Sequence, residues 1–125
     1  MTTPFDMRAD AITASDAARR IAHATHPASN WPGVEFIGDV YDTVGRLDGL
    51  AGSLNQALTQ AASYVRTEAA ADRLRQGHGR RAHVTAETAA VNLDAAAQAF
   101  AEARHFLAQA QAHLSPLAPA EVEQR

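Results

Sequence analysis

Apolar residues recur at alternating spacings of three and four from Ile37 to Val65, over four heptads. Such a repeat puts these residues on one stripe of a helix and is typical of the seam between two long helices. Three glycines, Gly38, Gly45 and Gly52, repeat every seven residues beside this stripe. A glycine inside a helix costs roughly 0.5–1 kcal/mol relative to alanine. The glycine stripe therefore predicts that another helix packs closely against this one.

A second repeat of seven residues lies near the C-terminus and predicts the partner of that seam. Large apolar residues recur at Leu93, Phe100, Leu107 and Leu114. Alanines recur beside them at Ala82, Ala89, Ala96, Ala103 and Ala110. The two repeats predict an antiparallel hairpin of helices at about residues 34–75 and 81–115, with Gly77 at the turn. In the predicted register Leu58 pairs with Ala96 and Leu54 with Phe100.

A shorter helix is predicted over residues 4–25, where an alanine-rich face ends before His26-Pro27. The residue before a proline is disfavoured in a helix, and the segment up to Gly33 is rich in turn residues. We expect this helix to fold back along the first half of the second one and to cover the glycine stripe. The predicted fold is all-α, with one three-helix domain over residues 1–117 and a disordered tail over 118–125.

Composition excludes several classes of function. Alanine supplies 30 of the 125 residues, which favours closely packed helices over a thick core. The net charge of −3 is unlike that of a general nucleic-acid coat, and the absence of cysteine excludes disulfides and thiolate chemistry. No apolar run approaches the ~20 residues of a membrane span, and the N-terminus lacks the pattern of a signal peptide. The expected location is the cytoplasm.

The segment around the predicted turn is basic. It contains four closely spaced arginines: Arg73, Arg75, Arg80 and Arg81. Arginines beside flexible glycine backbone can contact phosphate groups, so a nucleic-acid- or phosphate-binding regulator is an alternative function. No aromatic residue is interleaved with these arginines for base stacking, which favours a solvated turn instead.

Metal and catalytic sites are not predicted. His23 and His26 have helical spacing, and Glu102 with His105 matches the carboxylate–histidine pair of helical di-iron proteins. Glu102 and His105 fall away from the predicted seam, whereas a di-iron site needs inward carboxylates on several helices. The serines occur in no nucleophile motif, and the glycine-rich turn lacks the length and the lysine of a phosphate-binding loop. We expect no cofactor and no enzymatic activity.

Two short motifs resemble those of the WXG100 type of small secreted helical-hairpin proteins. Trp31-Pro32-Gly33 is similar to the Trp-x-Gly of that type, and Tyr64 with Glu68 is similar to its Tyr-x-x-x-Asp/Glu. The resemblance implies a secreted helical hairpin as a second alternative. The layout differs, because Trp31-Pro32-Gly33 joins the first helix to the second and a whole helix follows Glu68. A tryptophan that covers the corner between the first two helices is the other interpretation.

The predicted function is a non-enzymatic helical interaction or assembly module, which forms a homo-oligomer or binds a helical protein partner. The half of the hairpin near the turn extends beyond the reach of the first helix and is the expected contact surface. Six residues are predicted to make the packing contacts: Leu58, Ala62, Val65, Ala89, Val91 and Leu93.

Overall fold

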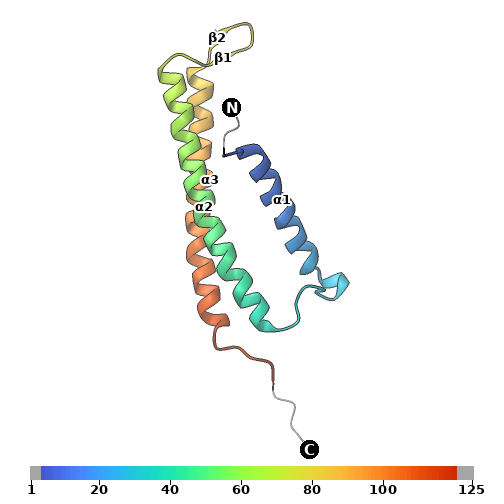
Figure 1. The fold of residues 1–125 in the computed structure, drawn as a ribbon. Coiled ribbons are helices and arrows are strands. Elements are labelled where there is room, and N and C mark those ends of the chain that lie inside the picture. The colour runs from blue at the N-terminus through green and yellow to red at the C-terminus, as the bar shows by residue number, and fades with distance from the viewer. Residues whose placement is uncertain (1–3, 121–125) are drawn as a thin grey trace, which may run out of the picture. The chain divides into compact units, whose positions relative to one another are not determined.

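The computed structural model describes residues 4–120 and confirms the all-α class with a long two-helix hairpin. Its elements follow the chain in a simple order (Figure 1). They are α1 (Met7–Ala24), a short 3-10 helix (Pro27–Ser29), α2 (Ile37–Ala70), β1 (Arg75–Gln76), β2 (Arg80–Arg81) and α3 (His83–Leu114). Residues 118–120 have no regular structure, and the rest of the predicted tail lies outside the described residues.

Residues 41–117 form one compact unit, which contains most of α2, both strands and α3. The described residues before position 41 belong to another unit. The single domain over residues 1–117 stays a prediction, as does the packing of residues 4–25 on the second helix.

In the unit that contains the residues before position 41, α1 begins three residues later than predicted because Asp6 caps it. The Asp6 carboxylate accepts a hydrogen bond of 3.0 Å from the Ala9 backbone N–H, which otherwise has no partner in the first turn. After α1, the Gly33 N–H donates to the Ala24 carbonyl at 2.7 Å. A Cβ atom at Gly33 would lie 2.5 Å from the Ala24 Cβ atom, so only glycine fits this corner. Trp31 is half exposed beside it.

The second helix ends five residues before its predicted end because Asp72 adopts the left-handed conformation (φ 57°). The Arg73 N–H then bonds to the Glu68 carbonyl at 2.9 Å, which closes the helix as a C-terminal glycine commonly does. Aspartate tolerates this conformation better than most residues do, so the helix needed no glycine to end.

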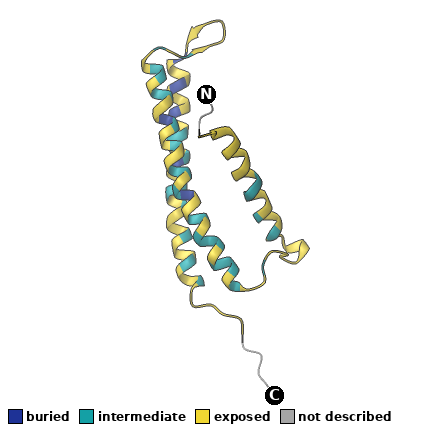
Figure 2. Ribbon diagram, viewed as in Figure 1, coloured by how far each residue is buried: buried dark blue, intermediate teal, exposed yellow. Residues whose placement is uncertain are grey.

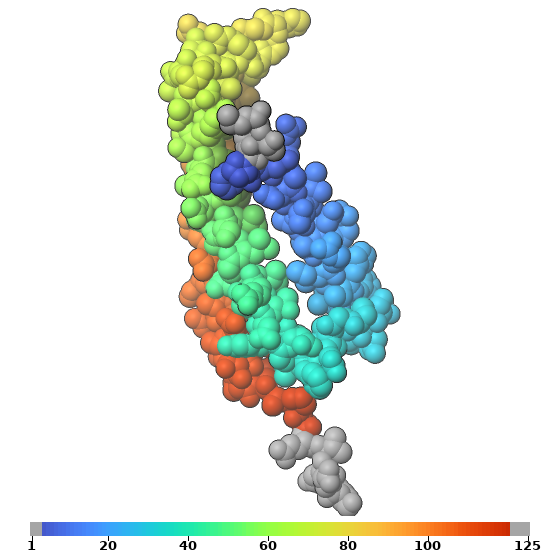
Figure 3. Space-filling view, viewed as in Figure 1, coloured from blue at the N-terminus to red at the C-terminus, as the bar shows by residue number. Residues whose placement is uncertain are grey.

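A small antiparallel ribbon replaces the simple turn that was predicted at Gly77. Arg75 pairs with Arg81 and Gln76 with Arg80, which leaves a three-residue loop centred on His78. His78 and Gly79 both have positive φ angles. We call residues 71–82 the tip. In the space-filling view (Figure 3) the yellow end of the tip stands clear of the two helices it joins.

Candidate interaction surfaces

The seam between α2 and α3 is built from alanine. The buried side chains of these two helices are Ala51, Ala62, Ala86, Ala90 and Ala97. Four of them lie in the half of the hairpin nearer the tip and Ala51 lies just beyond the middle, where parts of the helices are dark blue in Figure 2. The absence of large buried side chains lets the two backbones approach closely in this half.

The first alanine of the predicted repeat, Ala82, is buried, but at the next two steps the buried alanine is one residue later than predicted. Ala90 and Ala97 are buried, whereas Ala89 is exposed and Ala96 is half-buried. The prediction was wrong at these two steps because adjacent alanines satisfy the alternating three–four spacing equally well. The large residues of the repeat, Leu93, Phe100, Leu107 and Leu114, are all half-buried.

Seven-residue steps from Ala90 and Ala97 lead to Arg104 and Gln111, whose side chains lie against two glycines of α2. A Cβ atom at Gly52 would lie 2.7 Å from the Arg104 Nη1 atom, and one at Gly45 would collide with Nε2 of Gln111. At Gly38 a Cβ atom would meet nothing within 4 Å. The nearest atoms to Gly45 and Gly52 thus belong to α3, which corrects the prediction that the stripe fits the first helix.

Three hydrogen bonds join α2 and α3 along this flank, and the predicted register stays a prediction. The Arg104 Nε atom donates to Asp48 at 2.9 Å, and the Asn55 side chain donates to the Ala97 carbonyl at 2.6 Å. The Gln111 side chain donates to the Tyr41 carbonyl at 3.5 Å. The Asp48 carboxylate also raises the pKa of Arg104, because it stabilises the charged guanidinium.

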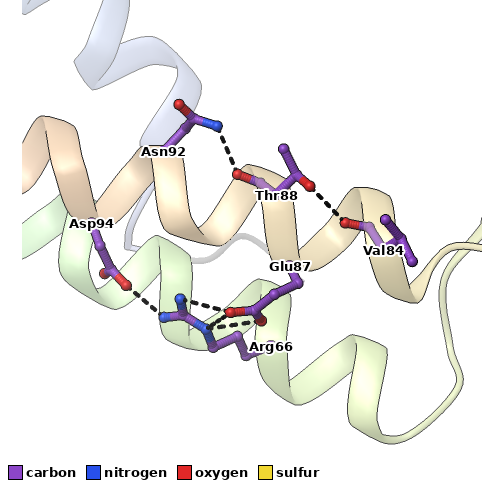
Figure 4. A network of polar contacts seen from close by, with 6 residues as sticks. All are labelled: Arg66, Val84, Glu87, Thr88, Asn92 and Asp94. Carbon is purple, nitrogen blue, oxygen red and sulfur yellow. Dashed lines mark hydrogen bonds and ion pairs between the residues drawn. The ribbon is translucent and has the colours of Figure 1, made fainter.

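A further ion-pair network lies nearer the tip (Figure 4). The Arg66 guanidinium contacts Asp94 at 2.7 Å and Glu87 at 3.2 Å, so one arginine of α2 joins two carboxylates of α3. The hydrogen bonds that Arg66 donates to Glu87, and then to Asp94, raise the pKa of Arg66. Arg66 continues the seven-residue stripe of Gly45 and Gly52. We call this flank of the hairpin the polar face.

The opposite flank carries no charged residue along most of its length, and we call it the uncharged face. In α2 the uncharged face is made by the heptad positions that lie across the seam from the polar face. These positions are Leu47, Leu50, Leu54, Ala57, Ala61 and Tyr64. Leu50, Ala57 and Tyr64 are exposed, and Tyr64 retains 66% of its accessible surface.

The α3 half of the uncharged face is made mostly of alanine. It consists of Ala89, Asn92, Ala96, Ala99, Ala103 and Phe106. Phe106 is 70% exposed, whereas Ala96 and Ala103 are half-buried beside the seam. This face was not predicted as a contact surface, although mapping the charges onto the heptad would have separated the two flanks.

The six residues predicted to contact a partner fall into three groups. Ala62 has no exposed surface left for a partner, and Leu58, Val65 and Leu93 are half-buried. Ala89 is exposed on the uncharged face. Val91 is 53% exposed and belongs to the polar side of α3.

The four tip arginines are unequally available. Arg73 forms an ion pair of 2.6 Å with Glu68, and Arg75 forms one of 2.9 Å with Asp72. The hydrogen bonds from these arginines lower the pKa of Glu68 and the pKa of Asp72. Arg80 and Arg81 are exposed in β2. Half of the predicted anion-contact set is thus engaged by carboxylates of the same chain.

Two open hollows lie along the polar face. One, of about 500 Å³, is lined by Asp42, Gly45, Arg46 and Gln111. The other, of about 350 Å³, is lined by Asp48, Asn55, Ala101, Arg104, His105 and Ala108. Over residues 4–120, no group of three or more histidine, aspartate or glutamate side chains is placed to hold a metal ion. Within the same residues, each helix is too short or too polar to cross a membrane.

No protein-family model matches the chain, and comparisons with curated proteins and with solved structures give no significant match.

Proposed function

We propose that the hairpin is an interaction module that binds a helical protein element through its uncharged face. The observation that carries the proposal is the unequal distribution of charge across α2 and α3. The ion pairs of Asp48 and Arg66 with α3 lie on the polar face, whereas the uncharged face exposes Leu50, Tyr64 and Phe106. Exposed apolar side chains gathered on one face are typical of a contact surface.

The size of the side chains on this face favours a helical partner. The α3 half of the face is mostly alanine and the α2 half carries leucines and Tyr64, so we expect a shallow channel on α3 beside a ridge on α2. A helix carrying leucine and alanine on one side can fill such a channel, because small residues allow close approach and large ones fill the space between them. Because this face has no carboxylate or guanidinium, a partner can bind there without removing water from a charged group.

The tip is the alternative site, for a nucleic acid or another phosphate-bearing partner. Arg80 and Arg81 remain exposed there, while Glu68 and Asp72 neutralise their neighbours. Binding through phosphate contacts would weaken steeply with added salt, whereas apolar binding would not.

The WXG100-like alternative rests on Trp31, Gly33, Tyr64 and Glu68, and here Tyr64 lies within α2 and not after it.

The proposal can be tested with a synthetic amphipathic helix that has leucine and alanine on one face and glutamate, lysine and glutamine on the other. Fluorescence anisotropy of the labelled peptide should show saturable binding to the chain. Ala57→Arg places a charge on the uncharged face and should weaken binding at least about tenfold. Gln56→Arg, one residue away on the other side of α2, is the matched control and should bind like the unmodified chain. An equal loss in both variants, or no binding at all, would contradict the proposal.

A further inference from the structure

We infer that the partner of the uncharged face is a second copy of this chain, which rests on the proposed function and makes it more specific. The face presents a ridge and a channel side by side. A two-fold axis along the hairpin would place the α2 ridge of each copy in the α3 channel of the other. The result is a four-helix bundle in which every helix has antiparallel neighbours.

The side chains of the face fit this arrangement. Because this axis keeps every residue at its height, Leu54 of one copy would meet Ala96 and Ala99 of the other. Leu50 would meet Ala99 and Ala103, so that large residues oppose small ones. The alternative axis, across the hairpin, would set leucine ridge against leucine ridge and leave the alanines facing one another. Self-complementarity of a single surface is what a two-fold interface requires.

The area of the face is sufficient for a reversible dimer. The segment from Leu47 to Tyr64 is about 26 Å long at ~1.5 Å per residue, and two adjacent helices are about 20 Å wide. The face therefore covers about 500 Å² per copy, or about 1,000 Å² in the pair, which is the lower limit for a specific interface. Because this interface contains no charge, its formation desolvates no ionised group.

Single cysteines can report the arrangement, since the chain contains no cysteine of its own. Ala57→Cys and Ala99→Cys are prepared as separate full-length variants and then mixed under oxidising conditions. The mixture should yield a disulfide-linked dimer that contains one copy of each variant, whereas Ala57→Cys alone should yield far less. The matched control mixes Gln56→Cys with Gln98→Cys, which lie one residue away on the polar side and should not be linked.

Sedimentation equilibrium of the unmodified chain gives the second measurement. The mass should rise from one copy to two with concentration, and Ala57→Arg should weaken this association at least about tenfold relative to Gln56→Arg. A chain that stays monomeric at all concentrations, or links equally through both cysteine pairs, overturns the second-copy inference. If such a monomer still binds the synthetic helix through Ala57, the partner is another protein and the proposed function stands.

Discussion

The Arg104 guanidinium lies directly over the backbone of Gly52, with its Nη1 atom 2.7 Å from the point where a Cβ atom would stand. The same guanidinium donates from Nε to Asp48 at 2.9 Å. Gly52 therefore makes room for an ion pair between α2 and α3, and Gly45 does the same for Gln111. Two of the four glycines that cost α2 stability as an isolated helix, Gly45 and Gly52, are thus places where polar side chains of α3 lie against α2.

Substitution by alanine should separate the glycines that make room for a side chain from those that do not. Gly49→Ala should stabilise the chain by about 0.5–1 kcal/mol, because a Cβ atom there meets nothing within 4 Å and alanine favours the helix. Gly52→Ala should gain less, since Arg104 has to move, and Gly52→Leu should destabilise. Urea unfolding followed by circular dichroism measures all three. Equal gains for the two alanine variants would show that Arg104 needs no space at Gly52.

Asn55 should tolerate alanine better than aspartate. Its side-chain N–H donates to the Ala97 carbonyl at 2.6 Å in a partly buried position. Asn55→Ala loses this hydrogen bond and should cost about 0.5–1.5 kcal/mol. Asn55→Asp also replaces the donor with a charged acceptor that repels the carbonyl, so its cost should be larger. The free energies of unfolding of the two variants test this order, and a more stable aspartate variant would contradict the hydrogen bond.

Glu87 and Asp94 should be energetically coupled because Arg66 bridges them. In a double-mutant cycle, the effects of Glu87→Gln and Asp94→Asn on the free energy of unfolding should not add. Each change alters the environment of Arg66, with which the other carboxylate is also paired. The coupling should decrease at high salt, because all three side chains are partly exposed. Repeating the cycle in an Arg66→Met background is the control, where the coupling should disappear. Strict additivity with Arg66 present would argue against the network.

Acid should destabilise the helix ends beside the tip. The pKa of Glu68 is lowered by Arg73, and the pKa of Asp72 is lowered by Arg75 and then by Arg81 and His83. A carboxylate with a lowered pKa in the folded state stabilises the fold above its ordinary pKa, here 4.5 for Glu and 3.8 for Asp. This stabilisation is lost as the pH falls through the lower, folded-state value. Urea midpoints measured from neutral pH downward should decline below about pH 4.5. The decline should be shallower in Glu68→Gln/Asp72→Asn, and an unchanged slope would exclude these two groups as its cause.

Gly33 should not accept alanine, in contrast to Gly38. A Cβ atom at Gly33 would lie 2.5 Å from the Ala24 Cβ atom, and the Gly33 N–H bonds to the Ala24 carbonyl. Relief of this overlap requires a backbone shift, which typically costs about 1–3 kcal/mol. Gly38→Ala enters open space and should be neutral or stabilising. Amide hydrogen exchange of residues 24–34 should increase in Gly33→Ala only. Equal protection in the two variants would mean that the corner can adjust without cost.

The uncharged face could have been identified from the sequence, whereas the polar face could not. Leu47, Leu54 and Ala61 repeat every seven residues, and so do Leu50, Ala57 and Tyr64, with no charge among them. On the other flank, Arg104 and Gln111 follow Ala97 at steps of seven residues. A search for repeating apolar residues would not include them. These two side chains fit against α2 because Gly52 and Gly45, more than fifty residues earlier in the chain, leave space for them.

The sequence by itself determined the all-α hairpin, because periodic apolar residues and alanine-rich segments permit few other structures. It also determined the stripe of large residues from Leu93 to Leu114. Only the tertiary structure decided which alanines are buried, since Ala89 and Ala90, or Ala96 and Ala97, fit the spacing equally well. That choice depends on the space that α2 leaves opposite each residue of α3, and this space is a property of the paired helices together. The end of α2 at Ala70 was likewise settled by the left-handed conformation of Asp72, which glycine usually supplies.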